Sequence, residues 1–258
     1  METKKKVLVI GAHDDDPEFD AGGLVLRLRQ LGWEARFICV CHRRRYSKKQ
    51  MAAGSEIART YSNPEKMAEY LEQDYAAARV CGADKVHFTT PDNSFFFFDG
   101  EDVANLRDQI EDFEPDITLI HWMKDNHFEH VESAKLAMIA LGHSQIKCEV
   151  YAFEGGPWQT GIYFIPDFTI NITPVMDQLE ESLLCYNQLS AYGPGLVKEK
   201  KAIAQLRGHM SGYEYGESYK IIRFPSGDDP ELILPKLFGK DYRWGGGHQY
   251  PWGKQNLF

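Results

Sequence analysis

The sequence lacks paired cysteines, long apolar runs and an excess of positive charge, and each absence argues against a class of protein. Its five cysteines are scattered, odd in number and never spaced C-x-x-C, so neither a disulfide-built fold nor a thiolate zinc site is expected. No apolar stretch approaches the ~20 residues that span a bilayer. A net charge of −9 argues against general affinity for nucleic acid or anionic lipid.

Length and composition predict one large α/β domain, and the scattered cysteines predict a reducing compartment. The 258 residues, 43% of them hydrophobic, suffice for a sizeable core with or without a small appendage. The first residues, Met1 to Lys6, lead directly into an apolar run that is too short for the core of a signal peptide. With the cysteines interpreted as small core residues, these features predict a soluble cytoplasmic protein.

Short apolar runs alternate with helical patterns over the first 150 residues. Strands are predicted at residues 6–10, 34–41, 85–88, 117–121 and 147–153, and helices at 21–31, 66–82, 102–113 and 131–141. This alternation predicts a Rossmann-like, doubly wound α/β fold, with a mostly parallel sheet and helices on both faces. Later segments add strands near 168–172 and 217–224 and helices near 173–189 and 197–209.

This pattern predicts one main domain that carries the candidate site, followed by a short C-terminal extension. Residues 1–224 carry the alternating pattern, whereas residues 225–258 are dense in glycine, proline and aromatic side chains. We expect the extension to pack on the domain or on a neighbouring subunit of a homo-oligomer.

Two polar clusters begin where predicted strands end. Gly11 to Glu18 follows the first strand, and Lys124 to His130 follows the strand at 117–121. Ligands of open α/β sheets bind in the crevice beyond the carboxyl ends of the strands. Three consecutive aspartates beside a histidine repel one another unless a cation or a proton compensates them. A bound metal is the simplest explanation.

His13, Asp16 and His130 supply two imidazoles and a carboxylate, a set that suits catalytic zinc with an open water position and also suits ferrous iron. Asp15, adjacent to a ligand, is then placed to act as general base on a metal-bound water. These roles describe metal-assisted hydrolysis of an amide.

His127 precedes His130 by one helical turn, so both imidazoles can face the same crevice. A protonated His127 would stabilise the oxyanion of a tetrahedral intermediate, with Asp125 or Glu129 holding its ring. His121, at the end of a strand, is interpreted as a residue behind the ligands or in the core.

Two further features stay open from the sequence. Arg43, Arg44 and Arg45 follow the second strand, either as a solvated charge run or as a loop that contacts an anionic or sugar substrate. Phe95 to Phe98 can line a pocket, form a subunit interface or serve simple packing.

The two clusters resemble the paired motifs of a known family. Gly-Ala-His-Asp-Asp-Asp-Pro-Glu from Gly11 resembles A-H-P-D-D-x-E, and His127 to His130 resembles H-P-D-H, both from the PIG-L/LmbE-like zinc-dependent N-acetyl-sugar deacetylases. The resemblance extends over most of residues 5–224. It implies His13, Asp16 and His130 as ligands of one zinc per chain, Asp15 as base and His127 as oxyanion stabiliser. It also implies an N-acetyl amino sugar or conjugate as substrate.

This chain departs from the family pattern at four positions. Asp14 and Phe128 replace prolines, Glu129 replaces an aspartate, and Tyr70 stands near the position where the family often has a substrate-binding arginine. These changes leave open a metal-binding but catalytically weak binding or assembly protein. A dinucleotide-binding protein is disfavoured because G-x-G-x-x-G is absent and the aspartates would repel a pyrophosphate.

Overall fold

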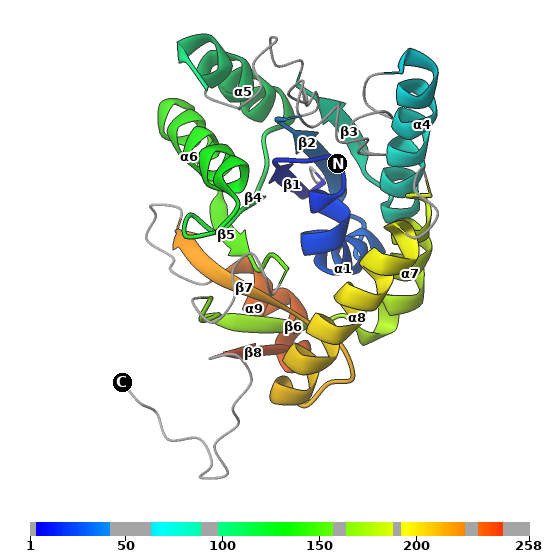
Figure 1. Cartoon of the computed structure of the whole chain (residues 1–258). Coiled ribbons are helices and arrows are strands. Elements are labelled where there is room, and N and C mark those ends of the chain that lie inside the picture. Colours follow the sequence, from blue (N-terminus) through cyan, green and yellow to red (C-terminus); the bar gives the residue numbers. More distant parts are fainter. Residues whose placement is uncertain are drawn as a thin grey trace.

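An eight-stranded sheet forms the centre of the computed structural model, which describes residues 4–41, 63–88, 98–156, 164–187, 192–224 and 232–244 (Figure 1). The order is β3-β2-β1-β4-β5-β7-β6-β8; the first five strands are parallel and the remaining pairings antiparallel. The strands are β1 (Lys6–Gly11), β2 (Glu34–Cys39), β3 (Asp84–His87), β4 (Ile117–Ile120), β5 (Glu149–Phe153), β6 (Phe168–Asn171), β7 (Gly216–Arg223) and β8 (Tyr242–Trp244). The predicted fold class is confirmed.

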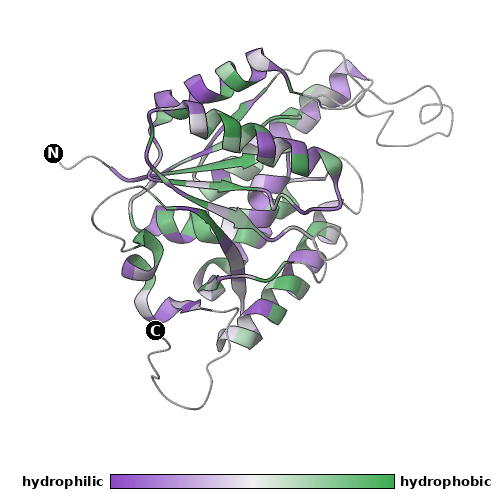
Figure 2. Cartoon of the chain, turned by 90° about the vertical axis from the view of Figure 1, so that its left-hand side faces the viewer, coloured by the Kyte–Doolittle hydropathy of each residue, from purple (hydrophilic) through white to green (hydrophobic). Residues whose placement is uncertain are grey.

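Helices cover both faces of this sheet. They are α1 (Asp16–Gln30), α4 (Pro64–Cys81), α5 (Gly100–Phe113), α6 (Phe128–His143), α7 (Met176–Leu184), α8 (Tyr192–Ser211) and α9 (Ile233–Phe238), with 3₁₀ turns at Thr173–Val175 and Gly239–Asp241. Strand β1 shows the two-sided burial, since Val7 and Val9 pack into the core under α1 and α7 while Leu8 and Ile10 pack under α5 and α6. A strand that is buried on both faces carries apolar residues at consecutive positions, and the central strands are accordingly coloured mostly as hydrophobic in Figure 2.

The strand order reverses between β1 and β4. From β1 the chain runs to β2 and β3 on one side, and it then returns to β4 and β5 on the other. Such a switch point opens a crevice beyond the carboxyl ends of the two strands. Both polar clusters follow these two strands, so the topology brings the two motifs to one place.

The helices that follow the clusters begin earlier than predicted. Helix α1 starts at Asp16 instead of residue 21, with Asp15 as its N-cap and a proline in its first turn. Helix α6 starts at Phe128, immediately after His127. The acidic motif therefore lies at a helix N-terminus, whose partial positive charge favours carboxylates.

Several predicted features fall outside the described residues. These are Arg43, Arg44 and Arg45, most of the phenylalanine run at 95–98, and residues 245–258 of the extension. Within the extension, α9 was not predicted, and β8 joins the sheet beside β6. The boundary at residue 225 stays a prediction. Among the described residues, no helix combines the length and hydropathy needed to cross a membrane.

A buried ion pair joins α1 to the antiparallel part of the sheet. The Glu217 carboxylate of β7 accepts the backbone N–H groups of Gly23 and Leu24 at 2.9 and 2.7 Å. Lys200 Nζ lies 2.7 Å from the same carboxylate, and both side chains are almost fully buried. Gly23 permits this close approach, because a Cβ there would lie 2.7 Å from Glu217 Oε1 and 2.8 Å from Ile172 Cγ2.

Gly23→Ala is therefore expected to lower the free energy of unfolding by about 1–3 kcal/mol, because the methyl group overpacks the contact with Glu217. Urea unfolding followed by circular dichroism measures this change. Gly142→Ala is the matched control, since a Cβ there meets no atom within 4 Å. Equal stability of the two variants would contradict the packing described for α1 and β7.

Candidate active site

Three side chains from the two clusters meet at the carboxyl ends of β1 and β4, where a different oxygen of Asp16 faces each of two imidazoles. His13 Nδ1 lies 3.4 Å from Asp16 Oδ2, His130 Nε2 lies 3.6 Å from Asp16 Oδ1, and the two imidazole nitrogens are 3.2 Å apart. Donors around a tetrahedral zinc with bonds of about 2.0–2.1 Å lie about 3.3 Å apart. The chemistry of these donors therefore fits a divalent metal, and the 3.2 Å between the two imidazole nitrogens matches this spacing.

Two carboxylates hold the outer nitrogens of these imidazoles. Glu129 Oε2 lies 2.7 Å from His13 Nε2, and Asp125 Oδ2 lies 2.8 Å from His130 Nδ1. A carboxylate on the outer nitrogen fixes the ring and keeps the proton there, which leaves the inner nitrogen free to bind a metal. Asp125 also accepts the backbone N–H of His127 at 2.6 Å, at the start of α6.

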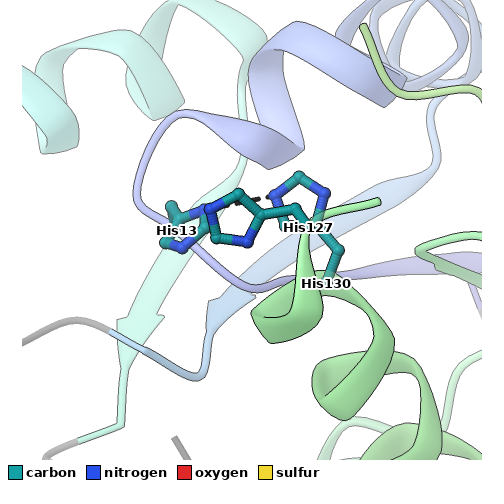
Figure 3. Close-up of side chains that lie close together, drawn as sticks. All are labelled: His13, His127 and His130. Atoms are coloured by element: carbon teal, nitrogen blue, oxygen red, sulfur yellow. Dashed lines mark hydrogen bonds between the residues drawn. The ribbon is translucent and has the colours of Figure 1, made fainter. Parts of the chain in front are cut away.

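His127 completes a cluster of three histidines at this edge of the sheet (Figure 3). Its ring lies edge-on to His13 at 4.8 Å between centroids and stacks on His130 at 4.5 Å. Asp125 and Glu129 are the two residues expected to hold the His127 ring. Glu129 lies 3.9 Å from His127 Nδ1, within ion-pair range, whereas Asp125 contacts the backbone of His127. Phe128, which replaces a motif proline, is 40% exposed and stacks on the His127 ring.

His121 is buried behind the donors and contacts them directly. Its Nε2 accepts the backbone N–H of Ala12 and lies 3.0 Å from Asp16 Oδ2, and its ring stacks on His130 at 3.9 Å. Burial, together with the charge of His130, lowers the pKa of His121 to about 4, so the ring is neutral near pH 7. Asp16, His121 and His130 also form a possible metal-binding group, as do the three histidines of Figure 3.

The pKa values of Asp15 and Asp16 are shifted in opposite directions. Burial would raise the pKa of Asp16, but the surrounding histidines outweigh it and hold that pKa well below the usual value. Burial and the charge of Asp16 raise the pKa of Asp15. Tyr192, the first residue of α8, donates its hydroxyl to Asp15 Oδ2. Tyr192 stands 177 residues away in sequence, so no local pattern marked it.

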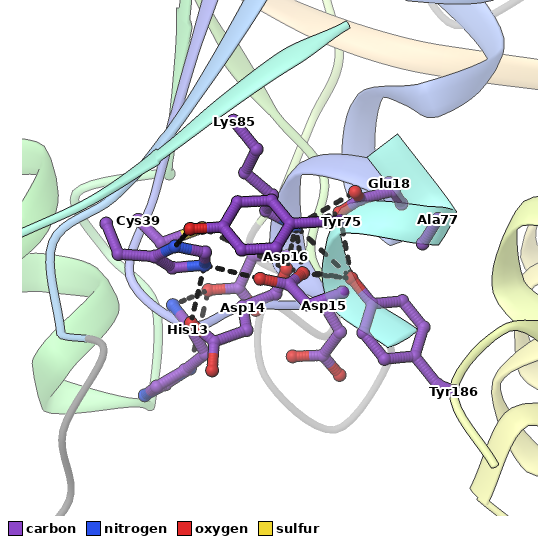
Figure 4. A network of polar contacts seen from close by, with 12 residues as sticks. His13, Asp14, Asp15, Asp16, Glu18, Cys39, Tyr75, Ala77, Lys85 and Tyr186 are labelled. Atoms are coloured by element: carbon purple, nitrogen blue, oxygen red, sulfur yellow. Dashed lines mark hydrogen bonds and ion pairs between the residues drawn. The ribbon is translucent and has the colours of Figure 1, made fainter. Parts of the chain in front are cut away.

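A second network holds the backbone of the acidic loop (Figure 4). The buried Lys85 Nζ contacts both Glu18 oxygens at 2.9 Å and also contacts Asp74 and the Asp14 carbonyl. The Tyr186 hydroxyl donates to the same carbonyl at 2.9 Å. Sequence reasoning missed Lys85 of β3, Asp74 of α4 and Tyr186, which follows α7. Their contacts fix the loop between His13 and Asp16.

Comparison with known proteins supports the resemblance read from the motifs. The 4-carboxy-2-hydroxymuconate hydratase of Pseudomonas putida is similar in structure, with a TM-score of 0.71, 22% identity, 88% of this chain and 100% of that chain covered. The N,N'-diacetylchitobiose deacetylase of Pyrococcus horikoshii gives a TM-score of 0.64 with 18% identity over 84% of each chain. A deacetylase of teicoplanin biosynthesis gives 0.65 with 15% identity, covering 87% of this chain and 100% of that one.

These identities are low, and the three likenesses establish the fold alone. A match to a family model carries the assignment further. Residues 8–141, which contain both polar clusters and therefore His13, Asp16 and His130, match the model of the PIG-L family, GlcNAc-PI de-N-acetylase. This chain therefore belongs to the PIG-L family.

Proposed function

We propose that this chain is a metal-dependent N-deacetylase that hydrolyses an N-acyl group, with N-acetyl as the expected case, from an amino sugar or a sugar conjugate. The observation that carries the proposal is the convergence of His13 Nδ1 and His130 Nε2, 3.2 Å apart, with one oxygen of the Asp16 carboxylate facing each of them at 3.4 and 3.6 Å. Family membership and the deacetylases among similar structures support it. Zinc is the proposed metal, one per chain in this site, with Fe²⁺ as the alternative for a set of two histidines and a carboxylate.

The metal, when bound, would supply a Lewis acid that polarises the amide carbonyl and lowers the pKa of the attacking water. His13 would offer Nδ1 and His130 would offer Nε2, since Glu129 and Asp125 occupy the opposite nitrogens. Asp16 remains ionised across the working pH range because its pKa is held low. Metal binding requires an ionised carboxylate, and Asp16 meets that condition.

Asp15 would take a proton from the attacking water and return it to the leaving amine. Its raised pKa brings it closer to the range in which a carboxyl group both accepts and donates a proton. The Tyr192 hydroxyl bond to Asp15 Oδ2 holds the carboxylate in place. His127, in contact with the rings of His13 and His130, would place a proton beside the developing oxyanion.

Exposed apolar side chains between the end of β4 and the start of α6, the segment that carries His127, suit the faces of a sugar ring or an apolar conjugate. Phe128 is 40% exposed at the start of α6, and Met123 is 42% exposed in the loop after β4. Contact of Arg43, Arg44 and Arg45 with an anionic or sugar substrate stays a prediction. So do the homo-oligomer and the packing of the extension from residue 225.

A hydratase is the second candidate function. This chain covers the whole of the P. putida hydratase with a TM-score of 0.71, and its second motif contains Phe128 and Glu129 in place of proline and aspartate. Addition of water to a conjugated acid uses the same kinds of group, an acid, a base and a polarised oxygen. Release of acetate distinguishes deacetylation from such an addition.

Zinc-loaded protein is expected to release acetate from at least one member of a panel of N-acetyl amino sugars and conjugates. Asp15→Asn should lower kcat by about 10²–10⁴-fold while retaining zinc, because it removes the base and leaves the ligands. His130→Ala should lose both zinc and activity. Asp108→Asn, a carboxylate on the exposed face of α5, is the matched control. No acetate from any substrate, with zinc bound, would contradict deacetylation.

Glu129→Gln is expected to weaken zinc binding by about 10–100-fold, because it removes the carboxylate that orients His13. Competition with a chromogenic chelator measures this affinity. Glu129→Asp should weaken binding similarly, since the shorter aspartate side chain would not reach His13 Nε2, which lies 2.7 Å from the Glu129 carboxylate. Glu132→Gln on the same helix pairs with Lys135 and serves as control. Unchanged affinity in both Glu129 variants would show that this contact does not orient His13.

A further inference from the structure

Beside the candidate active site lies a second group of possible metal ligands, formed by Asp14, Cys39 and His87. Asp14 is in the loop after β1, Cys39 ends β2 and His87 ends β3. Their donor atoms lie within 4.8 Å of one another. Asp14 and Cys39 are almost fully buried, and the His87 side chain is 6% exposed. This group shares no residue with the donors His13, Asp16 and His130.

Buried charged groups surround these donors. Lys85 Nζ pairs with the carboxylates of Glu18 and Asp74 and contacts the backbone carbonyl of Asp14. A metal ion held by these donors would add positive charge beside the Asp14 carboxylate. The Nε2 atom of His87 is in contact with Asp74 Oδ2 and lies 3.6 Å from Asp14 Oδ1.

The donor types select the class of cation. A thiolate, an imidazole and a carboxylate suit zinc or cobalt, whereas magnesium and calcium prefer oxygen ligands alone. The outer nitrogen of His87, Nδ1, lies 3.2 Å from the Tyr75 hydroxyl. A hydrogen bond at that position orients an imidazole whose other nitrogen binds a metal.

We propose that Asp14, Cys39 and His87 form a second site for a thiophilic divalent cation such as zinc, with Asp74 beside it as a further carboxylate. The Cys39 thiol, which now points to the Asp14 carbonyl at 3.9 Å, would release its proton to solvent on binding. The ion would join the loop of His13 and Asp16 to strands β2 and β3. Sequence spacing gave no sign of the site, because the three donors come from separate segments.

Cobalt substitution tests the second site, because cobalt bound to a thiolate has a strong charge-transfer absorption in the near ultraviolet. The metal-free protein reconstituted with Co²⁺ is expected to bind about two ions per chain and to show this band. Cys39→Ser should lose the band and about one ion per chain. Cys148→Ser should keep both, since Cys148 immediately precedes β5, at the amino ends of the strands, and bonds to Thr118 and Arg223. Asp14→Asn, expected to weaken the band, provides a second variant should Cys39→Ser fail to fold.

Two results would overturn the second site. One is wild-type protein that binds a single cobalt without the charge-transfer band. The other is a band that survives in Cys39→Ser. His130→Ala separates this test from that of the proposed function, because it should remove the active-site cobalt and leave the thiolate band unchanged.

Discussion

The contact of the Asp16 carboxylate with three imidazoles is the interaction on which this edge of the molecule depends. Asp16 is 7% exposed, accepts the backbone N–H of His13 at 2.6 Å and lies within 3.6 Å of nitrogens of His13, His121 and His130. A carboxylate buried this deeply is tolerated only where positive charge or donors compensate it. The backbone N–H of His13 is one such donor, and a metal bound between Asp16 and the inner nitrogens of His13 and His130 would supply the positive charge.

The fold supplies this convergence through the reversal of strand order. Strands β1 and β4 are neighbours in the sheet, and the residues that follow them meet although they are more than 100 positions apart in sequence. The network of Lys85, Glu18, Asp74 and Tyr186 then holds the Asp14 carbonyl from the other side. The loop between His13 and Asp16 is thus fixed from both directions, which is the preorganisation that a catalytic metal site requires.

Local patterns predicted the parts of this structure that depend on nearby residues. The apolar runs marked the central strands, and the spacing of the two motifs placed His13, Asp16, His127 and His130 at strand ends. Strand β8 was missed because a three-residue strand has too few positions to show a period. The start of α1 was predicted late because its first turn is acidic and carries no apolar pattern.

Contacts between distant segments left no such signal. Tyr192 reaches Asp15 from the start of α8, and Lys85 reaches Glu18 from β3, so neither pairing is visible in any window of the sequence. The family resemblance supplied roles for the motif residues. It did not supply the partner of Glu129, whose side chain is one methylene longer than the aspartate of the motif and lies 2.7 Å from His13.

Anomalous diffraction at the zinc edge, from crystals of the zinc-loaded protein, tests the metal centre most directly. The donor geometry predicts a peak about 2.0–2.2 Å from His13 Nδ1, from a carboxylate oxygen of Asp16 and from His130 Nε2. A peak held by His121 in place of His13, a peak held by the three histidines without Asp16, or no peak at this position would contradict it.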